Sequence, residues 1–87
     1  LYLAVINGHD KVVRLLVEAG ANKDEADNDG DTPLHNAARK GHDKVASLLL
    51  EAGANKDIQS NAGDTPLDLA RRQRNTSIVK ILEEYQR

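Results

Sequence analysis

The sequence predicts an all-α fold in which a helix–turn–helix unit recurs every 33 residues. Residues 8–33 align with residues 41–66, and the two segments are identical at 19 of 26 positions. Two Thr-Pro pairs and the glycines that follow each apolar run mark helix starts and stops. The 87 residues include eleven Leu and eleven Ala but no Phe, Trp, Met or Cys, which suits thin apolar layers between stacked helix pairs.

The first helix of the unit is predicted from its two ends. Thr32 is a good helix N-cap, and Pro33 suits the first helical position because its missing N–H is not needed there. The helix is therefore predicted over residues 34–40. It ends at Gly41, since glycine readily takes the left-handed conformation. The same opening signal recurs at Thr65–Pro66.

The second helix and a loop complete the unit. A helix is predicted to begin near Asp43, whose carboxylate suits the positive end of the helix dipole, and to stop at Gly53. Its apolar stripe consists of Val45, Leu48 and Leu49. The polar stretch 55–64 predicts a hairpin-like loop, and residues 27–30 (DNDG) mark the tight turn of the equivalent loop in the preceding copy.

We interpret residues 1–87 as one domain. Dividing 87 residues by the 33-residue period gives about 2.6 repeats. They are predicted at about 1–30, truncated on its N-terminal side, at 31–63, and at 64–87, where residues 78–87 form a C-terminal cap. The chain has no initiator Met, signal peptide or transit peptide, so we expect it to be a fragment of a longer protein.

Three motifs within the period carry a family resemblance. The segments DTPLH at 31–35, GH at 41–42 and LLLEAGAN at 48–55 resemble the ankyrin repeat family, and the resemblance covers essentially the whole chain. It implies a right-handed all-α ankyrin-repeat solenoid that acts as a protein–protein interaction module without catalysis. In that family the hairpin tips and the concave face of the first helices typically contact the partner.

The binding positions of the family fall on the hairpins and first-helix ends of this chain. The expected contacts are Ala26, Asn28, Asp29, Asp31, Arg39, Lys40, Gln59, Asn61, Ala62, Asp64, Arg72 and Gln73, with Ile6 and Asn7 in the first copy. Residues 24–31 hold five acids and no base, whereas the helix side carries bases. We therefore expect a protein or peptide partner with opposite charges in matching order. The alternative is a structural spacer, or a designed or duplicated scaffold without its own partner.

Two turn and capping positions depart from the family pattern. His35 in the family bonds the Thr of its own repeat and nearby backbone, but Tyr2 and Asp68 occupy its position in the other copies. We expect the complete network only in the middle repeat. Arg74 replaces the turn glycine, and we expect Asn75 to take the left-handed conformation in its place.

Polar residues also stand at layer positions. Asn36 occupies the position of Leu3 and Leu69, so its amide must be hydrogen-bonded to avoid a loss of stability. Arg71 and Glu83 replace apolar residues in the last repeat, as an outward-facing end requires.

Other site chemistries fit the sequence poorly. The loop from Glu25 has oxygens and a glycine at calcium-loop positions, but Pro33 starts a helix inside it and no bidentate Glu closes it. His9 and His42 are repeat equivalents, about 10 Å apart in a stack of helices, and cannot share one zinc ion. The serines have no independent His/Asp pairing. We expect no enzyme activity, no cofactor and no metal.

Charge and composition exclude further classes. The chain has 12 basic and 14 acidic residues, and its basic group lacks the interleaved aromatics typical of nucleic-acid binding (Arg71, Arg72 and Arg74). No apolar run reaches the roughly 20 residues of a membrane span. The lack of cysteine and of a secretory signal favours an intracellular, cytoplasmic protein.

The N-terminal face is predicted to be the weak point. Leu1, Leu3, Val5 and Val12 lack a preceding repeat that would cover part of their surface. We expect repeat 1 to fray or to self-associate weakly.

Overall fold

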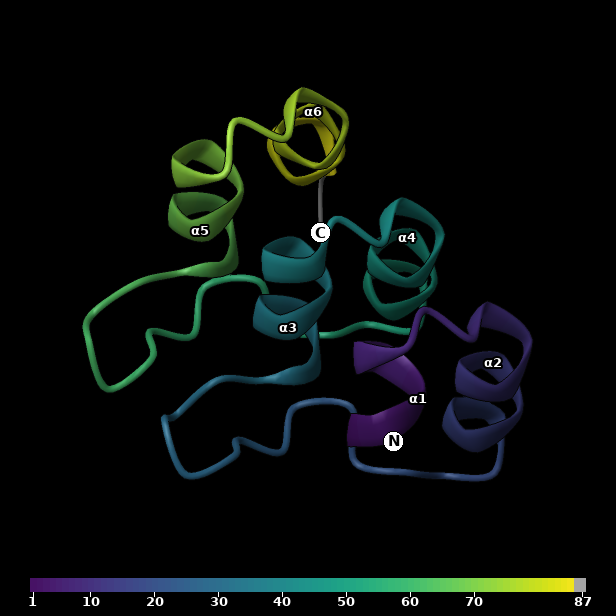
Figure 1. Ribbon diagram of the computed structural model, residues 1–87. Coiled ribbons are helices and arrows are strands. Elements are labelled where there is room, and N and C mark those ends of the chain that lie inside the picture. The colour runs from purple at the N-terminus through teal and green to yellow at the C-terminus, as the bar shows by residue number, and fades with distance from the viewer. Residues whose placement is uncertain (86–87) are drawn as a thin grey trace.

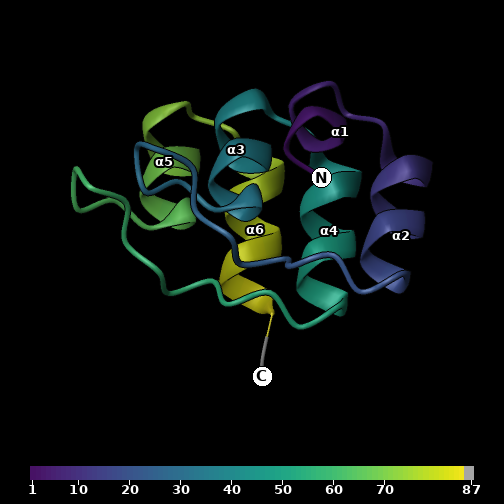
Figure 2. The same cartoon turned by 90° about the horizontal axis from the view of Figure 1, so that it is seen from below.

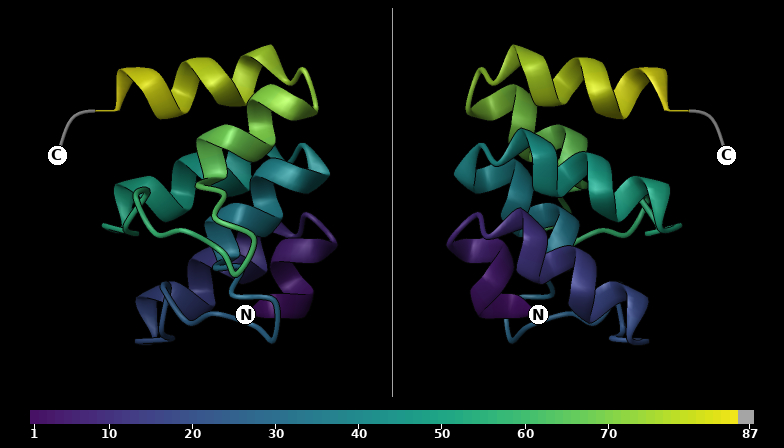
Figure 3. Two further views of the ribbon diagram at one scale, coloured as in Figure 1. Left: turned by 90° about the vertical axis from the view of Figure 1, so that its left-hand side faces the viewer. Right: turned by 90° about the vertical axis from the view of Figure 1, so that its right-hand side faces the viewer.

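The computed structural model describes residues 1–85, which form six helices and no strand. In chain order they are α1 (Tyr2–Ile6), α2 (Asp10–Glu18), α3 (Pro33–Lys40), α4 (Asp43–Glu51), α5 (Pro66–Arg72) and α6 (Thr76–Glu84). Helices α1, α3 and α5 form one row and α2, α4 and α6 a second (Figure 1), and each helix packs against its equivalent in the next pair. Figure 3 shows the three pairs stacked in chain order. The predicted all-helical stack is confirmed.

Helix ends follow the predicted local signals. Thr32 caps α3, since its Oγ1 accepts the His35 N–H at 3.4 Å while the Thr32 N–H donates to His35 Nδ1 at 3.0 Å. Gly41 ends the helix in the left-handed conformation with φ 75°. Thr65 and Asp68 form the same reciprocal box at the start of α5. Short-range capping thus explains where α3 and α5 begin.

The core consists of aliphatic side chains between the stacked pairs. The largest fully buried ones are Leu34, Leu49, Leu50 and Ile78. Alanines fill the closest approaches between helices and are fully buried at Ala37, Ala38, Ala46 and Ala70. Because alanine lets neighbouring helices approach closely, the fully buried layer within residues 1–85 contains no aromatic residue except His35, and Tyr85 packs against its edge.

Asn36 is the polar exception in this layer. It is buried, and its Oδ1 accepts a hydrogen bond from Arg39 Nη1 at 3.2 Å. The predicted need for a partner is confirmed, because an unbonded amide there would cost free energy.

The turn between α5 and α6 differs from the prediction. Arg74 itself is left-handed, with φ 58°, whereas Asn75 has φ −86°. Asn75 instead caps α6, because its Oδ1 accepts the Ile78 N–H at 3.2 Å. The N-cap role requires a backbone outside the left-handed region. The strained conformation therefore falls on Arg74, at the position of Gly8 and Gly41.

The N-terminal face is exposed, but not at every predicted residue. Leu3 is 71% exposed and Val12 is also exposed, while Leu1 is half-buried. The prediction for Val5 is wrong: its side chain is fully buried, since it joins the core that α1 shares with α3. Leu15, which was not predicted, is 65% exposed.

The opposite end is polar, as predicted. Arg71 and Glu83 are both exposed, and Arg71 Nη2 lies 2.7 Å from Glu83 Oε2. The predicted cap ends in Gln86 and Arg87, which lie outside the described residues. None of the described helices is long and apolar enough to cross a membrane.

Candidate functional site

Two hairpins project beside the first row of helices. The first hairpin comprises residues 22–31, between α2 and α3, and the second comprises residues 55–64, between α4 and α5. Their tips lie on the side of α3 and α5 that faces away from α4 and α6 (Figures 1 and 2). The hairpins and the first helices together therefore frame a concave surface.

The first hairpin is shaped by one aspartate. Gly30 N–H donates to the Asp27 carbonyl at 2.9 Å, which closes the predicted turn. Asp27 Oδ1 also accepts the N–H groups of Asp29 at 2.9 Å and Asp31 at 3.0 Å. An aspartate that bonds backbone two and four residues ahead stabilises the turn locally, before any contact with the next repeat.

The two hairpin tips are hydrogen-bonded to each other. Asn61 N–H donates to the Asp29 carbonyl at 2.9 Å, and Asn61 Nδ2 donates to the Asn28 carbonyl at 3.1 Å. A Cβ atom on Gly30 would lie 2.5 Å from Asn61 Oδ1. Glycine is thus required at residue 30 because the second tip approaches its backbone so closely.

An ion pair joins each hairpin base to its first helix. Arg39 Nη1 lies 2.8 Å from Asp31 Oδ2, and Arg72 makes two contacts to the Asp64 carboxylate, at 3.0 and 3.1 Å. The two pairs are repeat equivalents, 33 residues apart. The hydrogen bonds and charge of Arg72 hold the pKa of Asp64 below its ordinary value, and Asp64 raises the pKa of Arg72.

Histidine side chains join successive repeats. The Nδ1 atom of His35 accepts the Thr32 N–H, so Nε2 carries the proton and donates to the Asp64 carbonyl at 2.7 Å. In the last repeat, Asp68 exchanges hydrogen bonds with Thr65 and makes none to another repeat within residues 1–85. The complete network therefore occurs in the middle repeat, as predicted. His42 Nε2 similarly lies 3.0 Å from the Ile6 carbonyl oxygen.

A groove of about 390 Å³ lies between the hairpin tips and helices α3 and α5. We call it the concave groove; its lining is Asp29, Asp31, Arg39, Ser60, Asn61, Ala62, Asp64, Leu69, Arg72 and Gln73. Eight of the twelve predicted contact residues are among these ten. The sequence did not predict Ser60 and Leu69 as groove residues, because both have structural roles in the repeat. Ser60 Oγ accepts the Asp64 N–H at 3.3 Å, and Leu69 is almost fully buried.

The other four predicted residues lie outside the concave groove. Ala26 lines a separate hollow beside α1, and Asn28 borders a shallow one with Tyr2. Lys40 and Gln59 are exposed, and Gln59 Nε2 donates to the Gly63 carbonyl at 3.3 Å. Asp31 lines the groove but is only 3% exposed. It therefore helps to hold the groove in shape and offers little surface for a partner to contact.

Carboxylates gather at the first hairpin. Oxygens of Asp27, Asp29 and Asp31 lie within 4.8 Å of one another. Two of these side chains already have partners, since Asp27 Oδ1 accepts two backbone N–H groups and Asp31 pairs with Arg39. These carboxylates therefore stabilise the conformation of the first hairpin.

Comparison with known families gives one match over nearly the whole chain. The family model described as ankyrin repeats (3 copies) matches residues 1–86. No protein with curated annotation matches the chain.

Proposed function

The chain belongs to the ankyrin repeat family, and we propose that it binds a protein or peptide partner in the concave groove. Ankyrin repeats are generally protein–protein interaction modules, and the family is typically non-catalytic. One observation supports the proposal most: eight of the twelve contact residues predicted from the sequence line a single groove.

The groove is held in shape before any partner arrives. The Asn61 bonds tie its two tips together, and the Arg39 and Arg72 ion pairs fix each hairpin to its helix. A surface that is ordered in the free protein loses less conformational entropy when it binds. Asp29 and Gln73 are exposed on its two sides and offer polar contacts to a partner segment.

Quantitative affinity capture from a lysate, followed by calorimetry on each captured protein, tests the proposal. The groove variant is Asp29→Ala with Gln73→Ala, which keeps the backbone bonds of both loops. The control is Glu51→Ala with Ser47→Ala on α4, outside the groove, because it removes the same charge and one neutral polar group. We expect a partner whose affinity falls about tenfold with the groove variant and is unchanged with the control.

The opposite result favours the alternative. If no captured protein distinguishes the groove variant from the control, the concave groove binds nothing. The chain would then act as a structural spacer, or as a designed or duplicated scaffold without its own partner.

A second interaction is supported by the exposed N-terminal face. Leu3 and Leu15 are large apolar side chains exposed on neighbouring helices, so weak self-association through this face is proposed alongside partner binding. One domain over residues 1–87, a scaffold role and a cytoplasmic location stay predictions of the sequence.

A further inference from the structure

We propose that the concave groove binds a partner segment with two carboxylate side chains three residues apart, one for Arg39 and one for Arg72. The inference rests on the proposed protein-binding function and names the chemistry of the partner. Both arginines line the concave groove, and they are repeat equivalents at the ends of α3 and α5. We call these two residues the arginine row.

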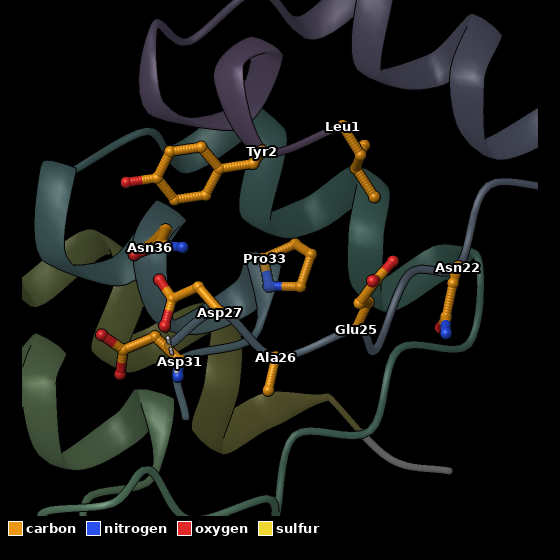
Figure 4. A pocket seen from close by; sticks show the side chains of 9 residues that line it. All are labelled: Leu1, Tyr2, Asn22, Glu25, Ala26, Asp27, Asp31, Pro33 and Asn36. Carbon is orange, nitrogen blue, oxygen red and sulfur yellow. Dashed lines mark hydrogen bonds between the residues drawn. The ribbon is translucent and has the colours of Figure 1, made fainter. Parts of the chain in front are cut away.

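In both ion pairs of the groove, the cation is the exposed member. The side chain of Arg39 is 40% exposed, whereas that of Asp31 is only 3% exposed. The side chain of Arg72 is 61% exposed, whereas that of Asp64 is 18% exposed. The Asp31 carboxylate also points away from Tyr2 and the hollow beside α1 (Figure 4), and it pairs with Arg39. A partner that enters the groove therefore meets guanidinium groups before it meets carboxylates.

Each guanidinium of the arginine row keeps hydrogen-bond donors for a ligand. Arg39 uses Nη1 for both Asp31 and Asn36. Arg72 uses one N–H from Nη1 and one from Nη2 for Asp64. A guanidinium has five N–H groups, so about three remain on each arginine within residues 1–85. Because the existing bonds already hold both side chains in place, a ligand loses little side-chain entropy when it binds them.

The helix side of the groove is cationic. Residues 36–41 and 69–75, which end α3 and α5 and form the turns after them, contain five basic residues and no acid. Lys40 is exposed and has no ion-pair partner among residues 1–85. The hairpin side of the groove carries the exposed Asp29. Charge complementarity therefore directs an acidic ligand segment to the helix side, along the arginine row.

The two arginines are close enough to act on one ligand. Helices α3 and α5 pack directly against each other, and both arginines line the same groove. After the hydrogen bonds and charge of Arg72, the charge of Arg39 also lowers the pKa of Asp64. The electrostatic field of Arg39 thus extends to the ion pair of the next repeat. One short segment can therefore contact the whole arginine row.

The spacing of the repeats sets the spacing of the two carboxylates. Neighbouring packed helices lie about 8–10 Å apart, so equivalent residues recur at about that distance. A polyproline II segment rises 3.1 Å per residue with three residues per turn, which places side chains three residues apart on one face, about 9 Å from each other. In a β-strand, residues three apart point to opposite faces and residues two apart are only about 7 Å apart. The arginine row therefore fits a Glu-x-x-Glu segment in the polyproline II conformation.

Titration of the 87-residue chain with a blocked Gly-Glu-Pro-Pro-Glu-Gly peptide, followed by NMR, tests the inference. The two prolines hold the spacer in the polyproline II conformation. We expect saturable shifts of the Nε–H signals of Arg39 and Arg72, and weaker binding when the ionic strength rises to about 0.15 M. Replacing both glutamates by glutamine should abolish the saturable shifts. Gly-Glu-Glu-Pro-Pro-Gly has the same composition and charge but adjacent carboxylates, and should bind several-fold more weakly.

Two double variants, each of which keeps the net charge of the chain, decide whether the arginine row is the site. Arg72→Gln with Asp64→Asn removes a groove ion pair without leaving an unpaired charge, and should weaken binding of the Glu peptide about tenfold. Arg71→Gln with Glu83→Gln removes the exposed ion pair outside the groove and should leave binding unchanged. If thermal unfolding shows that the first variant is destabilised, Arg72→Lys serves instead. Lysine keeps the charge beside Asp64 but lacks the planar fork, so binding should still weaken several-fold.

Several results would overturn the inference. They are absence of saturable shifts, equal binding of the glutamine peptide or of the peptide with adjacent glutamates, and equal loss of binding in both double variants. Tighter binding of a short uridine oligonucleotide than of the Glu peptide would also overturn it, because the arginine row would then serve a nucleic acid. The groove variant Asp29→Ala with Gln73→Ala tests the proposed function separately. A captured partner that depends on that variant but not on Arg72 and Asp64 would leave the protein-binding function intact and refute the acidic segment.

Discussion

The imidazole of His35 donates from Nε2 to the carbonyl oxygen of Asp64 at 2.7 Å, 29 residues further along the chain. The same ring caps the start of α3 through Nδ1. One fully buried side chain thus begins a helix and holds the base of the next hairpin, next to the ion pair of Asp64 with Arg72. The position of the concave groove therefore depends on a residue beneath it.

Replacing His35 should destabilise the whole stack. His35→Ala leaves the Thr32 N–H and the Asp64 carbonyl without partners and opens a cavity, so we expect a loss of about 2–4 kcal/mol in the free energy of unfolding. Urea denaturation measures it. His9→Ala is the control, because His9 is exposed, and it should change stability by less than about 0.5 kcal/mol. Similar losses in both variants would contradict the role assigned to His35.

Arg74→Gly should stabilise the protein. Arg74 has φ 58°, a conformation that costs a residue with a side chain about 1–2 kcal/mol and costs glycine little. The added freedom of glycine in the unfolded chain offsets part of this gain, so about 0.5–1 kcal/mol should remain. Gln73→Gly, at φ −79°, is the control and should destabilise. Thermal unfolding of both variants shows whether each substitution raises or lowers stability. A lower Tm for Arg74→Gly than for the parent would refute the prediction.

Alanine variants at two glycines should distinguish the free-energy cost of backbone strain from the cost of steric contact. Gly30 and Gly63 have similar φ values, 78° and 87°, but a Cβ at residue 30 meets Asn61 at 2.5 Å, whereas one at residue 63 meets nothing within 4 Å. Both alanine variants should carry a strain of about 1–2 kcal/mol. Gly30→Ala should lose about 1–3 kcal/mol more, because the two tips must separate. Chemical denaturation compares them, and equal losses would show that contact between the tips is unimportant.

The Asp64–Arg72 pair should make stability depend on acid pH. The pKa of Asp64 is lowered in the folded protein by the hydrogen bonds and charge of Arg72, so the pair stabilises fully above the unfolded value of about 3.8. This contribution is lost as the pH falls through the lower folded pKa. The difference in Tm between the parent and Asp64→Asn should therefore be largest near neutral pH and shrink below pH 4. A constant difference over this range would exclude the linkage.

The N-terminal face should drive weak self-association. Leu3 and Leu15 are the most exposed large apolar side chains among residues 1–85. Sedimentation equilibrium should show a mass that rises with concentration, and Leu3→Lys with Leu15→Lys should abolish the rise without lowering Tm. Amide exchange should be faster in α1 and α2 than in α3 and α4. A strictly monomeric parent with uniform protection would refute both parts.

The sequence by itself determined the helices and their order. The 33-residue period sets the order of the helices. Thr32–Pro33 and Gly41 act within one helical turn, so local chemistry is enough to place these helix ends. The exposure of Arg71 and Glu83 was likewise predictable, because they replace apolar residues at layer positions that recur with the period.

Only the tertiary structure decided which of these residues are accessible and what they contact. Asp31 was an expected contact and is almost fully buried, and Val5 is covered because α3 packs against α1. Arg74 became left-handed because Asn75 was needed as a cap for α6. Burial and cavities depend on how neighbouring repeats pack, which no local pattern of residues specifies.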